Sequence, residues 1–217
     1  MSQILTLVGV STLQTLEMVL FSTLFSMVIG FPLGVLLYST NSMGITPRPI
    51  LNQVLSRIVN VLRSFPFIIL MILLFPLSRL ILGTSIGTTA TIIPLSIAAA
   101  PFVARLVETA LLEVDPGMIQ AARAMGSTNS QIIVKVLIPE SLPSLVSGIT
   151  LTIINLIGYS AMAGTIGGGG LGDLAIRYGY QRFRPDVMAA SVVVIIVMVE
   201  VIQFIGTRIA NRMLANR

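Results

Sequence analysis

The sequence predicts an all-α polytopic membrane protein, with one transmembrane domain over residues 1–217 and five crossing helices. The chain is 55% hydrophobic and only 10% charged, and its mean hydropathy is +0.98. Soluble domains carry about 25% charged residues, so this chain has too few to cover a surface that faces water. Five stretches are mainly apolar over roughly 20 residues, the length that crosses a hydrocarbon core of about 30 Å.

The first crossing is expected at residues 18–38, inside a long run without charge. Residues 1–16 contain no Lys or Arg, so they lack the basic region of a cleavable signal, and the first crossing should remain in the mature protein. The second crossing is expected at 58–77 and the third within 80–104. The short segment 81–85 predicts a tight helical hairpin between these two.

The fourth crossing is expected from about residue 147 to 166, and the fifth from about 187 to 205. An odd number of crossings puts the two termini on opposite sides of the membrane. Nine of the thirteen basic residues would then share one side with the C-terminus and residues 106–146. Because Lys and Arg favour the cytoplasmic side, we expect a periplasmic N-terminus, a cytoplasmic C-terminus and a cytoplasmic 106–146 segment.

Glycine and proline residues interrupt several expected crossings, among them Pro32, Pro66 and Pro101. Inside lipid, each backbone group freed in this way needs a partner from a neighbouring helix or from water. Such helices suit a bundle that bends better than they suit simple anchors. Gly30 and Gly34 form a GxxxG pair, which lets two helices approach closely, either within the chain or between two copies.

The sequence contains no Cys and no His. This excludes thiolate chemistry, Cys/His metal sites and His-based catalytic triads, so we expect no catalytic residues and no metal ligands. The chain also lacks the G-x-x-x-x-G-K-[ST] phosphate loop. Any energy from ATP must therefore arrive through another protein.

A polar loop, residues 108–146, predicts two short helices joined by a sharp turn. Asp115 is a suitable N-cap, and Pro116 suits the first helical position, where its missing N–H costs nothing. The first helix should run to about Met125. Gly126 suits the position after the helix, where φ is often positive.

The second short helix should begin at Thr128, which forms a capping box with Gln131. Apolar residues at helical spacing continue to Ile138. We expect Pro139 to end this helix, because the residue before a proline disfavours α geometry. The two helices predict a docking surface for another protein, and a solvated connector is the alternative. A helix-turn-helix that reads DNA is disfavoured, because the loop is tethered at both ends and carries few basic residues.

The loop resembles the cytoplasmic signature of ABC importer permeases, E-A-A-x-x-x-G followed after nine residues by I-x-L-P. Glutamine replaces the signature's glutamate, which removes a charge and leaves shape and hydrogen bonding, and residues 136–139 match the end of the signature by type. The resemblance implies that the loop couples the chain to an ATPase through these residues: Gln120, Ala121, Ala122, Arg123, Ala124, Met125, Gly126 and Pro139.

This resemblance covers nearly the whole chain, with residues 13–205 as the permease core. The stretches 155–164, 167–173 and 178–181 are similar to those of methionine importers within the family. The resemblance implies a multi-pass protein of the bacterial inner membrane that forms the translocation pathway for D- and L-methionine. The implied partners are a second copy of the chain, two ABC ATPase subunits that bind ATP and Mg²⁺, a methionine-binding lipoprotein outside, and membrane lipid. Nucleic acid is not expected.

The same resemblance places the fourth crossing along the pathway, with Asn155, Tyr159 and Met162 as candidate pathway or gate residues. Met162 would help to shut the pathway at the axis between two copies, and ordinary packing is the alternative. Four successive glycines at 167–170 are too flexible for a helix interior. They predict either a re-entrant turn near the outer mouth or a simple tight loop.

A gradient-coupled carrier or channel that needs no ATPase is the alternative function, and a membrane scaffold is a third. Ion coupling usually needs an ionisable group within the membrane. Glu200, about two-thirds of the way across the fifth crossing, is the candidate for that role. We expect Glu200 to face the bundle or the inner interface, with a structural partner such as an arginine.

Overall fold

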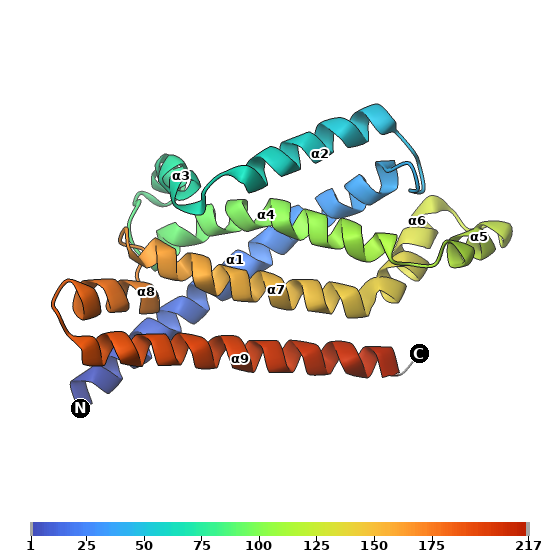
Figure 1. Cartoon of the computed structure of the whole chain (residues 1–217). Coiled ribbons are helices and arrows are strands. Elements are labelled where there is room, and N and C mark those ends of the chain that lie inside the picture. Colours follow the sequence, from blue (N-terminus) through green and yellow to red (C-terminus); the bar gives the residue numbers. More distant parts are fainter. Residues whose placement is uncertain (1, 216–217) are drawn as a thin grey trace.

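The computed structural model describes residues 2–215, which form helices joined by short connections (Figure 1). In chain order the elements are α1 (Ser2–Thr40), α2 (Pro49–Ser64), α3 (Phe67–Leu82), α4 (Thr88–Leu112), α5 (Pro116–Ala124), α6 (Asn129–Ile132), η1 (Ile133–Leu137), α7 (Ile138–Gly164), α8 (Gly170–Leu174), η2 (Ala175–Tyr180) and α9 (Pro185–Ala215). The elements η1 and η2 are π-helical turns. The prediction of an all-helical chain is confirmed for the described residues.

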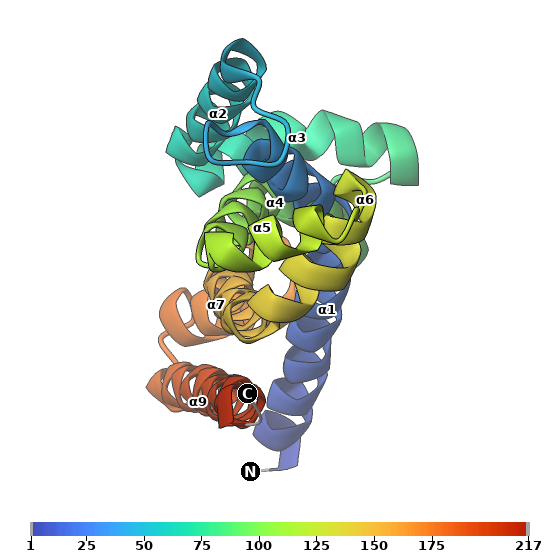
Figure 2. The same cartoon turned by 90° about the vertical axis from the view of Figure 1, so that its right-hand side faces the viewer.

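The bundle has two distinct ends. The α8 end also holds the start of α1, and the α5 end holds α6 and the last turns of α9 (Figure 1). The first and last long helices therefore begin and finish at opposite ends of the bundle, as an odd number of crossings requires. Figure 2 shows that α1 stands on one side of the layer formed by α4, α7 and α9.

Within the described residues, four helical segments are long and apolar enough to cross a membrane, or five if the bent α2–α3 pair is one span. They are Ile4–Thr40, Thr88–Leu112, Asn129–Gly164 and Pro185–Ala215. The third crossing, expected within 80–104, ends eight residues later than expected, at Leu112, and the fourth begins well before residue 147. The first and fifth extend beyond their expected bounds at both ends. Helical hydrogen bonds do not stop where hydropathy falls, so the helices continue into polar flanks.

The second crossing, expected over residues 58–77 with Pro66 as an interruption, consists of two helices that form one span only as a bent pair. Helices α2 and α3 meet at an angle of 102°. The break lies at Phe65, whose backbone is extended with ψ of 131°, the conformation that Pro66 imposes on the residue before it. The tight connection to the third crossing is confirmed, because Gly83 ends α3 with φ of +76° and α4 begins five residues later.

The prediction that Pro139 ends a helix is wrong. The helical segment runs without a break from Asn129 to Gly164, and Pro139 lies in the first turn of α7. The π-helical turn η1 directly precedes it. A π turn widens the helix by one residue and often marks an irregularity in the ladder, so the proline ring and its missing N–H are accommodated here rather than expelled.

The GxxxG pair serves packing within the chain. A Cβ atom added at Gly30 would lie 2.6 Å from the carbonyl oxygen of Ala100, and one at Gly34 would lie 2.5 Å from that of Ala104. These distances are too short for any side chain, so the two glycines let α1 lie directly on the backbone of α4. Of the two alternatives that the sequence leaves open, the intrachain contact is the observed one.

At the α8 end, the glycine run forms a turn that leads into a short packed helix. Gly167, Gly169 and Gly170 all have positive φ, a conformation that glycine adopts without steric cost. The N–H of Gly170 donates to Oε1 of Gln14 (3.0 Å), and the N–H of Leu171 donates to Oγ1 of Thr15 (2.9 Å). Side chains of α1 therefore hold the start of α8, and the segment is more than a simple loop.

Candidate functional site

Helix α5 is built by local signals at both of its ends. The Asp115 side chain accepts a hydrogen bond from the N–H of Gly117 (2.7 Å), and Pro116 occupies the first helical position. At the other end, Gly126 has φ of +79°. A Cβ atom at Gly126 would meet nothing within 4 Å, so the backbone conformation, and not space, favours glycine there. The predicted bounds of this helix are confirmed to within one residue.

The start of α6 is also as predicted. The N–H of Thr128 donates to Oε1 of Gln131 (2.8 Å), and the N–H of Gln131 donates to Oγ1 of Thr128 (3.4 Å). These two bonds are the reciprocal pair of a capping box. They fix the direction in which the chain leaves the Gly126 turn, and hence the position of α5 relative to α7.

The buried face of this unit consists of apolar residues from both short helices. Ala122, Ile132 and Leu137 are buried, in one cluster with Tyr38 of α1 and Val107 of α4. The apolar face of the second short helix therefore holds the unit against the chain's own long helices. Ala122 thus belongs to the anchored face and not to the free one.

The free face of α5 carries small and flexible side chains. Gln120, Ala121 and Ala124 are exposed, and Met125 is 80% exposed. Small residues permit close approach of another backbone, and methionine adapts its shape to a partner. Pro139 is exposed as well, but it lies on α7, outside this face.

Arg123 points back to its own chain. Its Nη2 donates to the carbonyl oxygen of Ile45 (3.0 Å) in the α1–α2 connection. That connection is itself held to the end of α1, because the N–H of Thr46 donates to the carbonyl oxygen of Ser39 (2.9 Å). Asn52 in the first turn of α2 also bonds to the end of α1, since its Nδ2 donates to the carbonyl oxygen of Leu37 (2.8 Å). Arg123 therefore ties α5 to the end of α1, a contact that no sequence pattern indicates.

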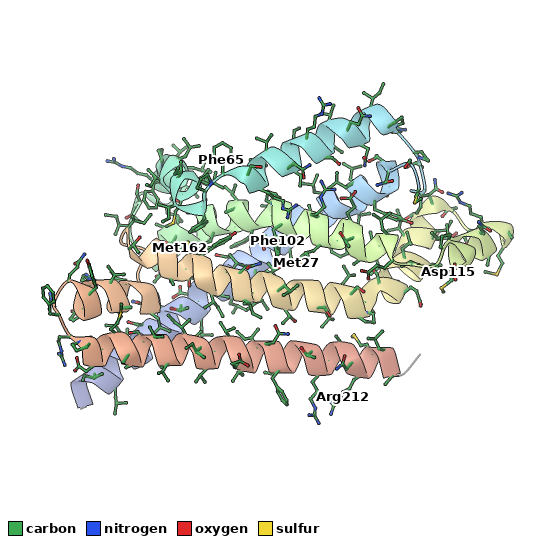
Figure 3. The ribbon with its side chains drawn as sticks, in the orientation of Figure 1. Met27, Phe65, Phe102, Asp115, Met162 and Arg212 are labelled. Atoms are coloured by element: carbon green, nitrogen blue, oxygen red, sulfur yellow. The ribbon has the colours of Figure 1, made fainter. Side chains whose placement is uncertain are left out.

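The candidate pathway residues on α7 fall into two groups. Asn155 is exposed, and Met162 is 45% exposed, and their spacing of seven residues puts them on one face of the helix. Figure 3 labels Met162 near the α8 end of α7. Tyr159 is turned toward the bundle, where its ring stacks on that of Phe67 with centroids 4.3 Å apart. Tyr159, four residues from Asn155 and three from Met162, is on the same side of α7, but its ring is covered by Phe67 whereas Asn155 and Met162 are exposed.

Comparison with known proteins matches residues 30–215 to the model of one family, the binding-protein-dependent transport system inner membrane components. The chain belongs to this family. The matched residues include α5 with Arg123, α7 with its candidate pathway residues, and the whole of α9. As a member of this family, the chain is a multi-pass component of the inner membrane and forms part of a transport system.

Individual members of the family agree with this assignment. The chain is 51% identical over 202 residues to a probable D-methionine transport system permease protein of Vibrio cholerae, covering 93% of this chain and 90% of that protein. It is 49% identical over 176 residues to a methionine import system permease protein of Bacillus subtilis, covering 81% and 79%. A chain of the inward-facing MetNI methionine ABC transporter superposes with a TM-score of 0.96 at 47% identity, covering 98% and 99%.

Proposed function

We propose that the chain is the pathway subunit of an ATP-driven methionine importer, and that ATP is hydrolysed on partner chains. The observation that carries this proposal is the geometry of α5, a short exposed helix whose opposite face is anchored in the chain's own core. The relatives named above transport methionine, and the solved relative is an ABC transporter. ATP and Mg²⁺ would be bound by the ATPase, consistent with the missing phosphate loop.

The proposed assembly contains two copies of this chain, two ABC ATPase subunits and a methionine-binding lipoprotein outside the membrane. We place the α5 end in the cytoplasm and the α8 end in the periplasm. The distribution of basic residues along the sequence supports this orientation, because the crossings expected from the sequence put nine of the thirteen on the side of residues 106–146. A cytoplasmic α5 is then in the same compartment as ATP.

In this proposal α5 is the coupling helix and the 108–146 segment is the coupling loop. The face with Gln120, Ala121 and Ala124 lies in a cleft of the ATPase, and the loss of the signature's glutamate makes that contact depend on shape. When the ATPase moves, α5 moves with it. Ala122 packing and the bond from Arg123 to Ile45 pass this displacement to the ends of α1 and α7.

In the same proposal, Met162 is the gate residue. It is exposed on the α7 face that it shares with Asn155, so two copies can bring it to a common axis. A cysteine at position 162 should form a cross-link between copies in at least one nucleotide state. A cysteine at position 159 is the matched control, because Tyr159 is turned to Phe67. If position 162 gives no cross-link in any nucleotide state, the gate assignment is wrong.

The decisive experiment is purification of the chain with its candidate ATPase, followed by reconstitution into liposomes. We expect the ATPase to remain bound, hydrolysis to rise with the methionine-loaded binding protein, and labelled methionine to accumulate only with ATP. Concentrative uptake by this chain alone, driven by an imposed ion gradient, would overturn the proposal in favour of a gradient-coupled carrier.

A further inference from the structure

The layer of α4, α7 and α9 has two unlike faces. Helix α1 lies against one of them (Figure 2). On this covered side, the groove between α1, α7 and α9 is lined by Val19, Ile153 and Ile202, and the neighbouring groove between α7 and α9 is lined by Ile149, Ile153, Ile202 and Ile205 with one threonine. The covered side is therefore an apolar one, suited to lipid.

The opposite face is polar toward the α5 end. A groove of about 260 Å³ between α4, α7 and α9 is lined there by apolar residues together with Thr109, Glu113, Ser144, Ser147 and Asn211. Ser144 and Ser147 come from α7 and Asn211 from α9, so both long helices turn polar groups to this side. Helix α1 contributes no residue to the lining of this groove.

Helix α9 carries a polar stripe on this open face, formed by Glu200, Gln203, Thr207 and Asn211. The residues are spaced by three or four positions, which places them on one side of a helix, and all four are exposed. Asn211 lines the polar groove, whereas Ile202 and Ile205 line the apolar one. The stripe therefore faces away from α1.

The stripe of α9 and the pathway candidates of α7 share the same side of the molecule. Ser147 and Leu151 of α7 line the polar groove. Asn155 and Met162 continue that face, since Asn155 lies four residues beyond Leu151 and Met162 seven residues beyond Asn155. The open face thus runs from the gate candidate near the α8 end to the polar groove at the α5 end.

Glu200 indicates most clearly whether lipid or water contacts this face. It lies 15 residues from Pro185, roughly 22 Å along a helix that rises 1.5 Å per residue, so it is far from either end of α9. A carboxylate turned to lipid at such a depth is costly. Within the described part of the chain the ion pairs join other residues: Arg105 with Glu108, Arg177 with Asp173, and Arg184 with Asp186.

Among the described residues, no ion pair joins an arginine to Glu200, and Glu200 is exposed rather than buried in its own bundle. Gln203 Nε2 donates to Thr207 Oγ1 (2.9 Å), which leaves the stripe's remaining donors and acceptors directed outward. Lipid cannot satisfy these groups, but water in a channel can. A second copy of this chain, facing the same way across that water, would enclose it.

We propose that Glu200, Gln203 and Thr207 line the water-filled cytoplasmic half of the transport pathway between two copies of the chain. The carboxylate of Glu200 meets the ammonium group of the amino acid as it passes. This inference rests on the proposed function for the identity of the cargo. The assignment of the lining rests on the position of the stripe alone. An experiment can therefore refute the lining without refuting the cargo, or the cargo without refuting the lining.

The lining is tested by cysteine accessibility in the assembled transporter, because the chain has no cysteine of its own. Single cysteines replace Glu200, Gln203 or Thr207, and a charged methanethiosulfonate reagent is added to inside-out vesicles. Matched controls replace Val201 or Ile205, which are 50% and 51% exposed on the flank of α9 away from the stripe. We expect stripe cysteines to react about tenfold faster or more, since the reactive thiolate forms in water. Equal rates at stripe and control positions would overturn the lining.

The carboxylate is tested by methionine uptake with Glu200→Gln and Glu200→Asp in the same vesicles. We expect the Gln variant to import severalfold more slowly and the Asp variant to recover most of the rate, with unchanged binding of the ATPase subunits. Normal uptake by Glu200→Gln would overturn the contact with the ammonium group. The accessibility pattern is read without transport, so a wild-type complex that failed to import methionine would refute the proposed function and leave the lining intact.

Discussion

Helices α5 and α8 are both short, both rich in small residues and both placed at an end of the bundle, yet the fold uses them in opposite ways. Helix α5 exposes Ala121 and Ala124. Helix α8 buries Gly170, Leu171 and Gly172, and α1 side chains hold its first two amides. Small residues permit close approach in both cases. The surrounding contacts decide whether the chain's own helices or another protein makes that approach.

The comparison is tested most severely at Gly172 of α8. A Cβ atom there would collide with the backbone of Ala161 in α7, and overpacking of this kind costs about 1–3 kcal/mol or more where backbone must shift. We expect Gly172→Val to lower the yield of folded protein and its thermal stability strongly. Gly9→Val is the control, because a Cβ at Gly9 meets nothing within 4 Å. Equal stability of the two variants would mean that α8 is not tightly packed.

At Gly126, beside α5, the expected loss is of coupling and not of fold. Valine at a φ of +79° costs about 1–2 kcal/mol, but it has space around it, so insertion and assembly should persist. We expect Gly126→Val to hydrolyse ATP while importing little methionine. Gly126→Asn should retain most of the uptake, because asparagine tolerates this conformation. Wild-type uptake by the valine variant would contradict the role of the turn.

Arg123 should show a smaller loss of coupling. Alanine at this position removes the bond to the Ile45 carbonyl and leaves the buried face of α5 in place. We expect Arg123→Ala to import several times less methionine per ATP hydrolysed, with normal ATPase binding. Lys135→Ala, which removes an exposed basic residue from the next helical segment, should leave that ratio unchanged. If both variants behave alike, α5 does not act through the α1–α2 connection.

The smallest effect is expected at Thr15, which holds α8 through one hydrogen bond. Thr15→Val removes a bond worth about 0.5–1.5 kcal/mol, so folding and uptake should survive. Amide hydrogen exchange at Leu171 should accelerate. Thr12→Val is the matched control, because Thr12 Oγ1 donates to the carbonyl oxygen of Val8 within its own helix. An unchanged exchange rate in Thr15→Val would show that α1 does not hold α8.

The parts of the fold that the sequence predicts well are those governed by local chemistry. The limits of α5, the positive φ at Gly126 and the capping box of α6 each depend on residues within four positions of one another. The number of apolar segments also follows from the hydropathy of successive residues along the chain. The exposed face of α7 that joins Asn155 to Met162 follows from helical periodicity, although its direction in the bundle does not.

Local sequence does not distinguish a proline that bends a helix from one that the helix accommodates. Pro66 and Pro139 carry the same local signal, yet the backbone bends by 102° beside Pro66 and continues as a helix through Pro139. The difference comes from the neighbouring turn, since η1 absorbs Pro139 and no π turn precedes Pro66 in the described helix α2. The residue before each proline does not distinguish them, because it is apolar in both cases.

Composition, periodicity and capping residues by themselves determined an all-helical membrane chain and its short α5 helix. Tertiary structure alone decided that Arg123 bonds to Ile45, that Tyr159 stacks on Phe67 and that the Glu200 stripe faces away from α1. The physical reason is range. Helix formation is settled within one or two turns, whereas the partner of a side chain depends on which distant helix packs beside it.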